Sequence, residues 1–163
     1  MLSTMTEKAM YIRESQVLDI AYLKTRLRQS DVDEIWASNN LTPTDALTFS
    51  YYLSKVCMTV VDENPVGMFG IVEDPENSQR ALIWMLGTDG LSKVAKKLFK
   101  ETKEFIEGFL DAYPLLYNFI DAENTRSIAW LRKLGAEIGE ARPHGKEGKL
   151  FCYFSFRRHL IHA

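Results

Sequence analysis

The chain has 163 residues, of which 46% are hydrophobic and 26% charged, as in one globular domain of ordinary size. Its nine Phe, seven Tyr and three Trp exclude disorder over most of the length. A net charge of −2 excludes a protein that binds nucleic acid through a broadly basic surface. The two cysteines, Cys57 and Cys152, form neither a disulfide framework nor a metal motif, and we predict no metal site.

The first half of the sequence predicts a strand, three helices and a hairpin. Thr42 is a preferred N-cap residue and Pro43 follows it at the first helical position, which marks the start of the third helix. The ranges expected are a strand over 10–13, helices over 17–23, 31–38 and 42–55, and a hairpin of strands 57–62 and 66–72.

The second half predicts alternating strands and helices. Residues 81–86 form a continuous apolar run, typical of a strand buried on both faces. A 3.6-residue apolar stripe predicts a helix over 89–111, a strand follows at 115–121, and Asn124 and Gly135 bound a helix over 125–134. A final hairpin pairs 136–141 with 150–157, after a polar loop that contains His144.

These elements predict an α+β fold with a central mixed sheet of about six or seven strands and helices on both faces. We expect a flexible N-terminus over residues 1–9, a single domain over 10–157 and a basic tail over 158–163. The first ten residues lack the apolar core of a signal peptide, and no segment approaches the about 18 apolar residues of a membrane span.

Two carboxylates are the candidate catalytic groups. Asp89 follows the buried strand and Asp121 ends the next one, and ligands of open sheets bind outside the carboxyl ends of parallel strands. A carboxylate there would take a proton from an amine. The alternative is that these residues, with Thr88 and Asn124, cap helices.

Lysines gather in the first half of the helix at 89–111. They include Lys93, Lys96 and Lys97, and near a helix N-terminus they would attract a phosphate or another anion. The alternative is a solvated helix face held by Lys–Glu pairs such as Lys97 with Glu101.

The order of elements resembles the GNAT superfamily of acyl-CoA N-acyltransferases, and residues 118–137 (NFIDAENTRSIAWLRKLGAE) are similar to its closing motif. Within the superfamily, the sequence looks closer to small tailed-phage proteins called internal virion protein A, or acetyltransferase-like. The segments that carry this resemblance are 12–19, 41–47, 65–72, 84–91 and 117–136.

The resemblance implies an acetyl-CoA site between the strands at 81–86 and 115–121. Its cofactor-binding positions in this chain are Gly87, Thr88, Gly90, Lys93 and Asn124. The chain departs from the superfamily pattern at two places. The turn GTDGLSK lacks the usual Gly spacing of the diphosphate loop, and Leu131 stands where the motif has a proton-donating Tyr.

Because both departures fall on the expected machinery, our first hypothesis is a phage-encoded GNAT-like protein without catalysis. It would bind a virion or host protein partner, need no cofactor, and reside in the virion or the host cytoplasm. The alternative is an acetyl-CoA-dependent N-acetyltransferase with Asp89 or Asp121 as base. A third possibility is an unrelated small-ligand module, so enzymatic activity stays open at this point.

Overall fold

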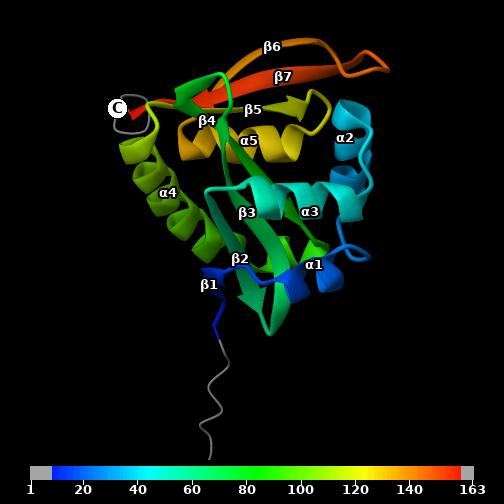
Figure 1. The fold of residues 1–163 in the computed structure, drawn as a ribbon, viewed down its shortest axis with the longest axis vertical. Coiled ribbons are helices and arrows are strands. Elements are labelled where there is room, and N and C mark those ends of the chain that lie inside the picture. Colours follow the sequence, from blue (N-terminus) through cyan, green and yellow to red (C-terminus); the bar gives the residue numbers. More distant parts are fainter. Residues whose placement is uncertain (1–8, 159–163) are drawn as a thin grey trace, which may run out of the picture.

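A seven-stranded mixed sheet forms the centre of the protein, with strand order β1-β2-β3-β4-β5-β7-β6 (Figure 1). The computed structural model describes residues 9–158. Its elements are β1 (Tyr11–Glu14), α1 (Val17–Leu23), α2 (Gln29–Asn39), α3 (Pro43–Leu53), β2 (Val56–Asp62), β3 (Asn64–Asp74), β4 (Asn77–Gly87), the 3-10 helix η1 (Asp89–Val94), α4 (Ala95–Ala112), β5 (Leu115–Asp121), α5 (Thr125–Leu134), β6 (Glu137–His144) and β7 (Lys149–Phe156).

The sheet has one parallel junction, between β4 and β5, and every other neighbouring pair is antiparallel. That junction consists of Arg80–Leu82 of β4 beside Leu115–Tyr117 of β5. Beyond it both strands continue, β4 to Gly87 and β5 to Asp121, without pairing with each other. The sheet is therefore parted at the carboxyl ends of its two central strands.

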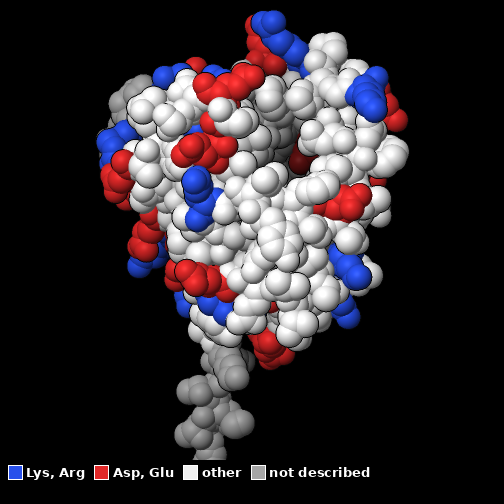
Figure 2. All heavy atoms as spheres, in the orientation of Figure 1, with Lys and Arg blue, Asp and Glu red and all other residues white. Residues whose placement is uncertain are grey.

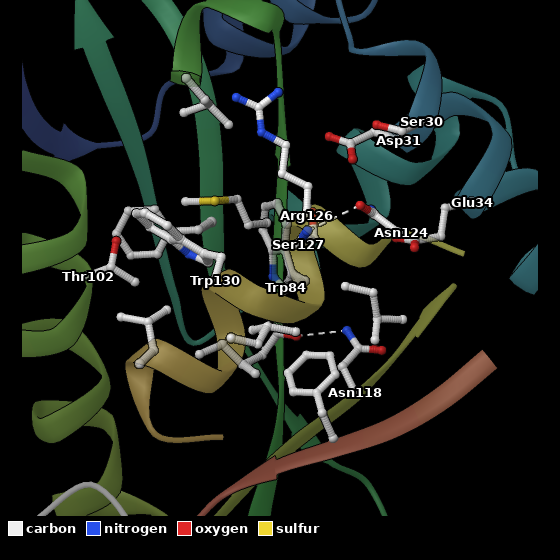
Figure 3. A pocket seen from close by; sticks show the side chains of 18 of the residues that line it. Ser30, Asp31, Glu34, Trp84, Thr102, Asn118, Asn124, Arg126, Ser127 and Trp130 are labelled. Carbon is white, nitrogen blue, oxygen red and sulfur yellow. Dashed lines mark hydrogen bonds between the residues drawn. The ribbon is translucent and has the colours of Figure 1, made fainter. Parts of the chain in front are cut away.

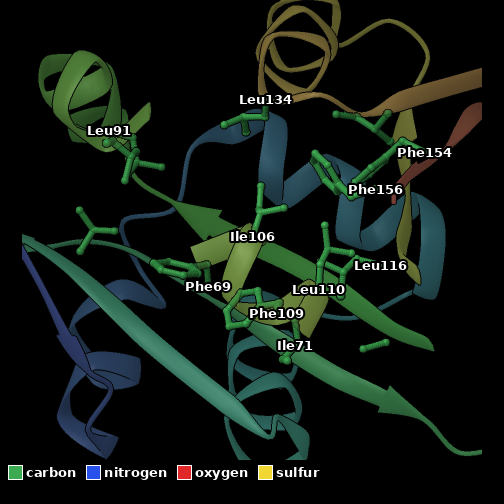
Figure 4. Close-up of a cluster of buried hydrophobic side chains, with 14 of the residues drawn as sticks. Phe69, Ile71, Leu91, Ile106, Phe109, Leu110, Leu116, Leu134, Phe154 and Phe156 are labelled. Carbon is green, nitrogen blue, oxygen red and sulfur yellow. The ribbon is translucent and has the colours of Figure 1, made fainter. Parts of the chain in front are cut away.

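Helices cover both faces of the sheet, and each face has its own core. On one face α4 and α5 pack on the sheet through Ile106, Phe109 and Leu134, against Phe69 and Leu116 (Figure 4). On the other face α1 and α3 bury a second cluster, which comprises Ile20, Leu23, Ala46, Leu47, Met68, Trp84 and Leu86. Because apolar surface is buried on both faces, packing of the helices stabilises β4 and β5 where these strands no longer pair with each other.

The expected α+β architecture, a mixed sheet with helices on both faces, is confirmed. The strand at 115–121 and the helix at 125–134 have the predicted bounds. The Asn124 side chain accepts a hydrogen bond from the Ser127 amide, and Gly135 closes the helix with φ 104°. Thr42 caps α3 in the same way, accepting from the Asp45 amide.

Two local expectations were wrong. The helix predicted over 89–111 begins as the 3-10 helix η1, because Thr88 turns the chain tightly by accepting the Gly90 amide on its side chain. The stretch at 73–79, whose polar composition predicts a loop, instead belongs to the β3–β4 hairpin. The Asp74 carboxylate folds that turn by accepting from the Glu76 amide and from Arg80 Nε.

Most of the two terminal segments, residues 1–9 and 158–163, lies outside the described residues, and so do His159 and His162. Between residues 9 and 158, no helix combines the length and the apolar character needed to cross a membrane.

Candidate functional site

A pocket of about 390 Å³ lies where β4 and β5 part, which is within the range of about 300–1,000 Å³ typical of ligand sites. Its lining comes from both faces of the sheet: from α4, α5 and β7 on one side and from α2 on the other. Figure 2 shows the surface hollowed in the upper half of the view, with an acidic side chain visible inside. The pocket thus passes through the gap in the sheet.

The half of the pocket between α4 and α5 is mainly apolar. Its walls are Leu98 and Ile106 of α4, Trp130 and Leu134 of α5, and sheet residues including Phe69, Ile83, Met85, Phe154 and Phe156. Thr102 of α4 also lines it, and among the described residues its buried hydroxyl has no hydrogen-bond partner (Figure 3). This half suits an elongated, largely apolar ligand that carries a polar atom.

The other half of the pocket is built by the first two turns of α2. Arg28 binds the Asp31 carboxylate at 2.9 Å, and Asp31 also accepts the Gly87 amide at 2.8 Å. The Arg28 amide in turn donates to the Gly87 carbonyl. Burial raises the pKa of Asp31 even though Arg28 opposes the shift. These bonds fasten α2 to the end of β4, so Asp31 has a structural task.

Glu34 lies one turn further along α2 and lines the pocket (Figure 3). Its Oε1 accepts the Asp121 amide at 2.8 Å, and no cation of the described chain lies within ion-pair distance of it. Burial, together with the nearby carboxylates of Asp31 and Asp121, raises its pKa to about 7. A carboxyl group with this pKa can both take up and release a proton near neutral pH.

The two carboxylates predicted from the sequence occupy different places. Asp89 lines the pocket at its edge and is exposed. Asp121 lies outside the lining; its Oδ2 pairs with Lys149 at 2.7 Å and its Oδ1 accepts the Glu123 amide. The main-chain amide of Asp121 therefore lies next to Glu34, whereas the Asp121 carboxylate is paired with Lys149.

Solved structures with a similar fold include N-acetyltransferases. A spermidine N-acetyltransferase from Vibrio cholerae, solved with CoA and spermine, shares 12% identity over 94% of this chain and 98% of its own, with a TM-score of 0.67. AAC(6')-Ib, solved with ribostamycin and coenzyme A, shares 16% over 95% and 97%, also with a TM-score of 0.67. A GNAT-family acetyltransferase from Streptococcus pneumoniae shares 16% over 90% and 96%, with a TM-score of 0.61.

The fold is the GNAT fold. No protein-family model and no curated protein matches the sequence. The resemblance to phage internal virion proteins accordingly finds no support in these comparisons. The structural neighbours are 10–16% identical to this chain, so the similarity shows the fold alone.

The turn after β4 is where the GNAT resemblance placed the diphosphate of CoA, and the amides of Gly87, Thr88 and Gly90 in this turn are already bonded within the protein. The Gly87 amide donates to Asp31, the Thr88 amide to the Val66 carbonyl at 2.9 Å, and the Gly90 amide to Thr88 Oγ1 at 3.0 Å. A Cβ on Gly90 would meet Val66 at 2.8 Å, so this glycine makes room for the protein's own side chain. The turn does not fit a diphosphate as an amide cradle.

Of the remaining predicted positions, Asn124 lines the pocket while capping α5, and Lys93 is exposed outside the lining. Arg126, in the first turn of α5, is the cationic side chain in the half of the pocket between α4 and α5 (Figure 3). The Lys–Glu pairs expected along the long helix do not form within 4.0 Å; Lys97 instead donates to the Met10 carbonyl at 2.7 Å.

Sequence reasoning missed Glu34, Asp31 and Arg28. The helix predicted over 31–38 begins earlier, at Gln29, with Arg28 as its N-cap. The spacing of Arg28 and Asp31 was a usable signal, because residues three apart at the start of a helix can form an ion pair. Nothing in the sequence indicates that Glu34 reaches β5, because that contact joins residues 87 positions apart.

Proposed function

We propose that this protein transfers an acyl group from an acyl-CoA thioester to an amine. The observation that carries the proposal is the pocket through the parted sheet, which joins an apolar channel on one face to the Glu34 carboxyl on the other. The fold of the N-acetyltransferase neighbours supports this proposal over a purely structural role.

In the proposed reaction Glu34 is the proton acceptor. Most amines are protonated at neutral pH, and an ammonium cannot attack a carbonyl carbon until it loses a proton. A carboxylate with a pKa of about 7 is a far better acceptor than an ordinary glutamate, whose pKa is near 4.5. The hydrogen bond from the Asp121 amide engages one oxygen of Glu34, and the other oxygen makes no hydrogen bond within the described residues.

The acyl-CoA would supply the acyl group as a thioester, which the neutral amine can displace. The apolar walls between α4 and α5 would hold the long arm of the donor, with Thr102 as a hydrogen-bonding hydroxyl. Arg126, rather than the amides of the β4 turn, would bind its diphosphate. Leu131 lines the pocket where the resemblance implied a tyrosine, so we assign no side chain to protonating the leaving CoA thiolate, which would take its proton from solvent.

A thiol-release assay with acetyl-CoA and a primary amine tests the proposal. We expect release that depends on the amine, and a pH profile of kcat/KM that rises with an apparent pKa near 7. The Glu34→Gln variant keeps the acceptor for the Asp121 amide but loses the base, so kcat/KM should fall about 10²-fold and the limb near pH 7 should disappear.

The matched control is Asp33→Asn, which changes an exposed carboxylate on the same helix and should leave the profile unchanged. Asp89→Asn and Asp121→Asn complete the series, because both residues were proposed as bases from the sequence. If Asp89→Asn abolished turnover while Glu34→Gln did not, the base would be Asp89 and our assignment would be wrong.

A second candidate function, a GNAT-fold protein that binds a partner without catalysis, is favoured by the bonded amides of the β4 turn and by Leu131. The phage and virion part of that hypothesis rests on sequence resemblance alone. A melting scan separates the candidates: a ligand at 100 times its Kd stabilises by about 2.7 kcal/mol, a shift of several degrees. No shift with about 1 mM acetyl-CoA and no turnover would favour the binding protein.

A further inference from the structure

Aromatic side chains form a continuous row across β5, β7 and β6. Tyr117 and Phe119 of β5 lie beside Tyr153 of β7, and His144 follows at the end of β6. Ring centroids are 6.0 Å apart for Tyr117 and Tyr153, 5.5 Å for Phe119 and Tyr153, and 4.3 Å for Phe119 and His144. We call these four residues the aromatic floor.

The floor faces the same side of the sheet as α1, α2 and α3. Tyr117 is paired with Leu82, which packs in the cluster beneath α1 and α3, and directly paired residues share a face. No helix of the described chain covers the floor at its centre, since Phe119 is 37% exposed and Tyr153 is 39% exposed.

The floor is continuous with the pocket, because Phe119 belongs to both. It enters the pocket on the side where α2 presents Glu34. An amine that reaches Glu34 from this side would therefore have the rest of its molecule over the floor. Exposed aromatic rings bind flat or ring-shaped groups through their faces and edges, and they attract cations.

The charges around the floor favour a cationic ligand. The nearby cations are already neutralised: Arg80 pairs with Asp74 at 2.6 Å, Lys149 with Asp121 at 2.7 Å, and Arg28 with Asp31 at 2.9 Å. Glu34 forms no ion pair within the described residues. Glu34 is therefore an acidic group without a cationic partner at this end of the pocket, and it is negatively charged above its pKa of about 7.

We infer that the acceptor is a primary amine carried on a ring, whose ring lies on the aromatic floor while its ammonium group faces Glu34. The inference rests on the proposed acyl transfer and names the class of its acceptor. A ring stacked on an aromatic side chain contributes about 0.5–1.5 kcal/mol, so the floor should change the preference between amines by about three- to tenfold.

The test compares tyramine and glucosamine, which carry aromatic and sugar rings, with propylamine, which has none. The readout is the ratio of kcat/KM for each ring-bearing amine to that for propylamine. We expect a ratio well above one in the unmodified protein and a fall of about three- to tenfold in Tyr153→Ala. Tyr52→Ala, which removes an exposed tyrosine of α3 outside the pocket and the floor, should leave the ratio unchanged.

The outcomes separate the inference from the proposed function. Turnover with an unchanged ratio in Tyr153→Ala would overturn the floor while acyl transfer stands. A fall for tyramine alone would assign the floor to aromatic rings, and a fall for glucosamine alone to sugar rings. If no amine were acylated, the proposed function would fail; calorimetric titration with tyramine and glucosamine would then decide, since binding weakened by Tyr153→Ala supports the floor and absent binding refutes it.

Discussion

Two carboxylates show how surroundings decide the chemistry of a residue. Asp19 is buried, which by itself raises its pKa, but hydrogen bonds from Arg13, the Gln16 amide and Thr59 outweigh burial and lower the pKa. Glu34 receives one amide bond and has acidic neighbours, so burial prevails and its pKa rises to about 7. Asp19 is thus a stable anion that fastens α1 to the sheet, and Glu34 is a proton carrier.

At this scale we predict that Asp19→Asn destabilises the protein by about 1.5–3 kcal/mol at neutral pH, because it weakens the charge-assisted hydrogen bonds between Asp19 and Arg13. The pKa of Asp19 is lower in the native state than its usual 3.8, so the stabilisation is complete above pH 3.8 and is lost as the pH falls through the lower native value.

Urea denaturation of both proteins at about pH 7 and at about pH 3 measures this. The gap in unfolding free energy should be smaller at the lower pH. A gap that stayed constant would mean that ionised Asp19 is not its cause.

At the scale of elements, one close approach of segments lies at β3. Gly70 lies between β2 and β4, and a Cβ there would sit 2.2 Å from the Val56 carbonyl oxygen and 3.2 Å from Trp84 Nε1. The Trp84 indole in turn donates to Ser54 Oγ at 2.8 Å. The glycine therefore lets the end of α3 and the sheet approach each other beside the pocket.

We predict that Gly70→Ala destabilises the protein by about 1–3 kcal/mol or more, because backbone atoms must move to admit the methyl group. Gly108→Ala is the matched change: it lies in α4 with no atom within 4 Å of its Cβ position, and it should stabilise by about 0.5–1 kcal/mol through helix propensity. Thermal melts of the two variants should shift in opposite directions, and equal shifts would contradict the packing argument.

At the scale of the whole molecule, the hydrophobic cores on the two faces of the sheet connect different sets of strands and helices. The core beneath α4 and α5 joins strands β2, β3, β4, β5 and β7, while the core beneath α1 and α3 joins those helices to β3 and β4. The pocket lies between them, where the sheet is parted and Glu34 is held in low-dielectric surroundings. Burial makes the ionised form of Glu34 costly in free energy, and the rest of the fold must offset that cost.

That cost predicts how stability depends on pH. The native state keeps Glu34 protonated up to about pH 7, whereas the unfolded chain ionises near 4.5, so the native state binds the extra proton and stability falls as the pH rises between these values. Glu34→Gln has no proton to lose. It should therefore become more stable than the unmodified protein by about 2–3 kcal/mol at pH 7 and above, with little difference below about pH 4.5.

Chemical denaturation across this pH range gives the comparison, with Asp33→Asn as the exposed control. A difference that did not grow between pH 4.5 and pH 7 would show that Glu34 has an ordinary pKa, and the proposed base would lose its basis.

Local sequence signals were sufficient for most elements. Caps at Thr42 and Asn124, the glycine at 135 and the apolar run at 81–86 act within a few residues of themselves, so α3, α5 and β4 could be predicted from the chain alone. The departures from the GNAT pattern, the altered turn after β4 and Leu131, were also visible in the sequence.

The site itself was decided by contacts between distant segments. Asp31 reaches the Gly87 amide, Glu34 reaches the Asp121 amide, and His144 leaves its expected polar loop to stack on Phe119. The residues of α2 contain no local signal that would place the start of this helix against the ends of β4 and β5. Its position depends on the packing of helices on both faces of the sheet. The sequence by itself thus determined which helices and strands form, and the tertiary structure decided which carboxyl group lies in the pocket and with what pKa, because burial and neighbouring charge exist only once the chain has folded.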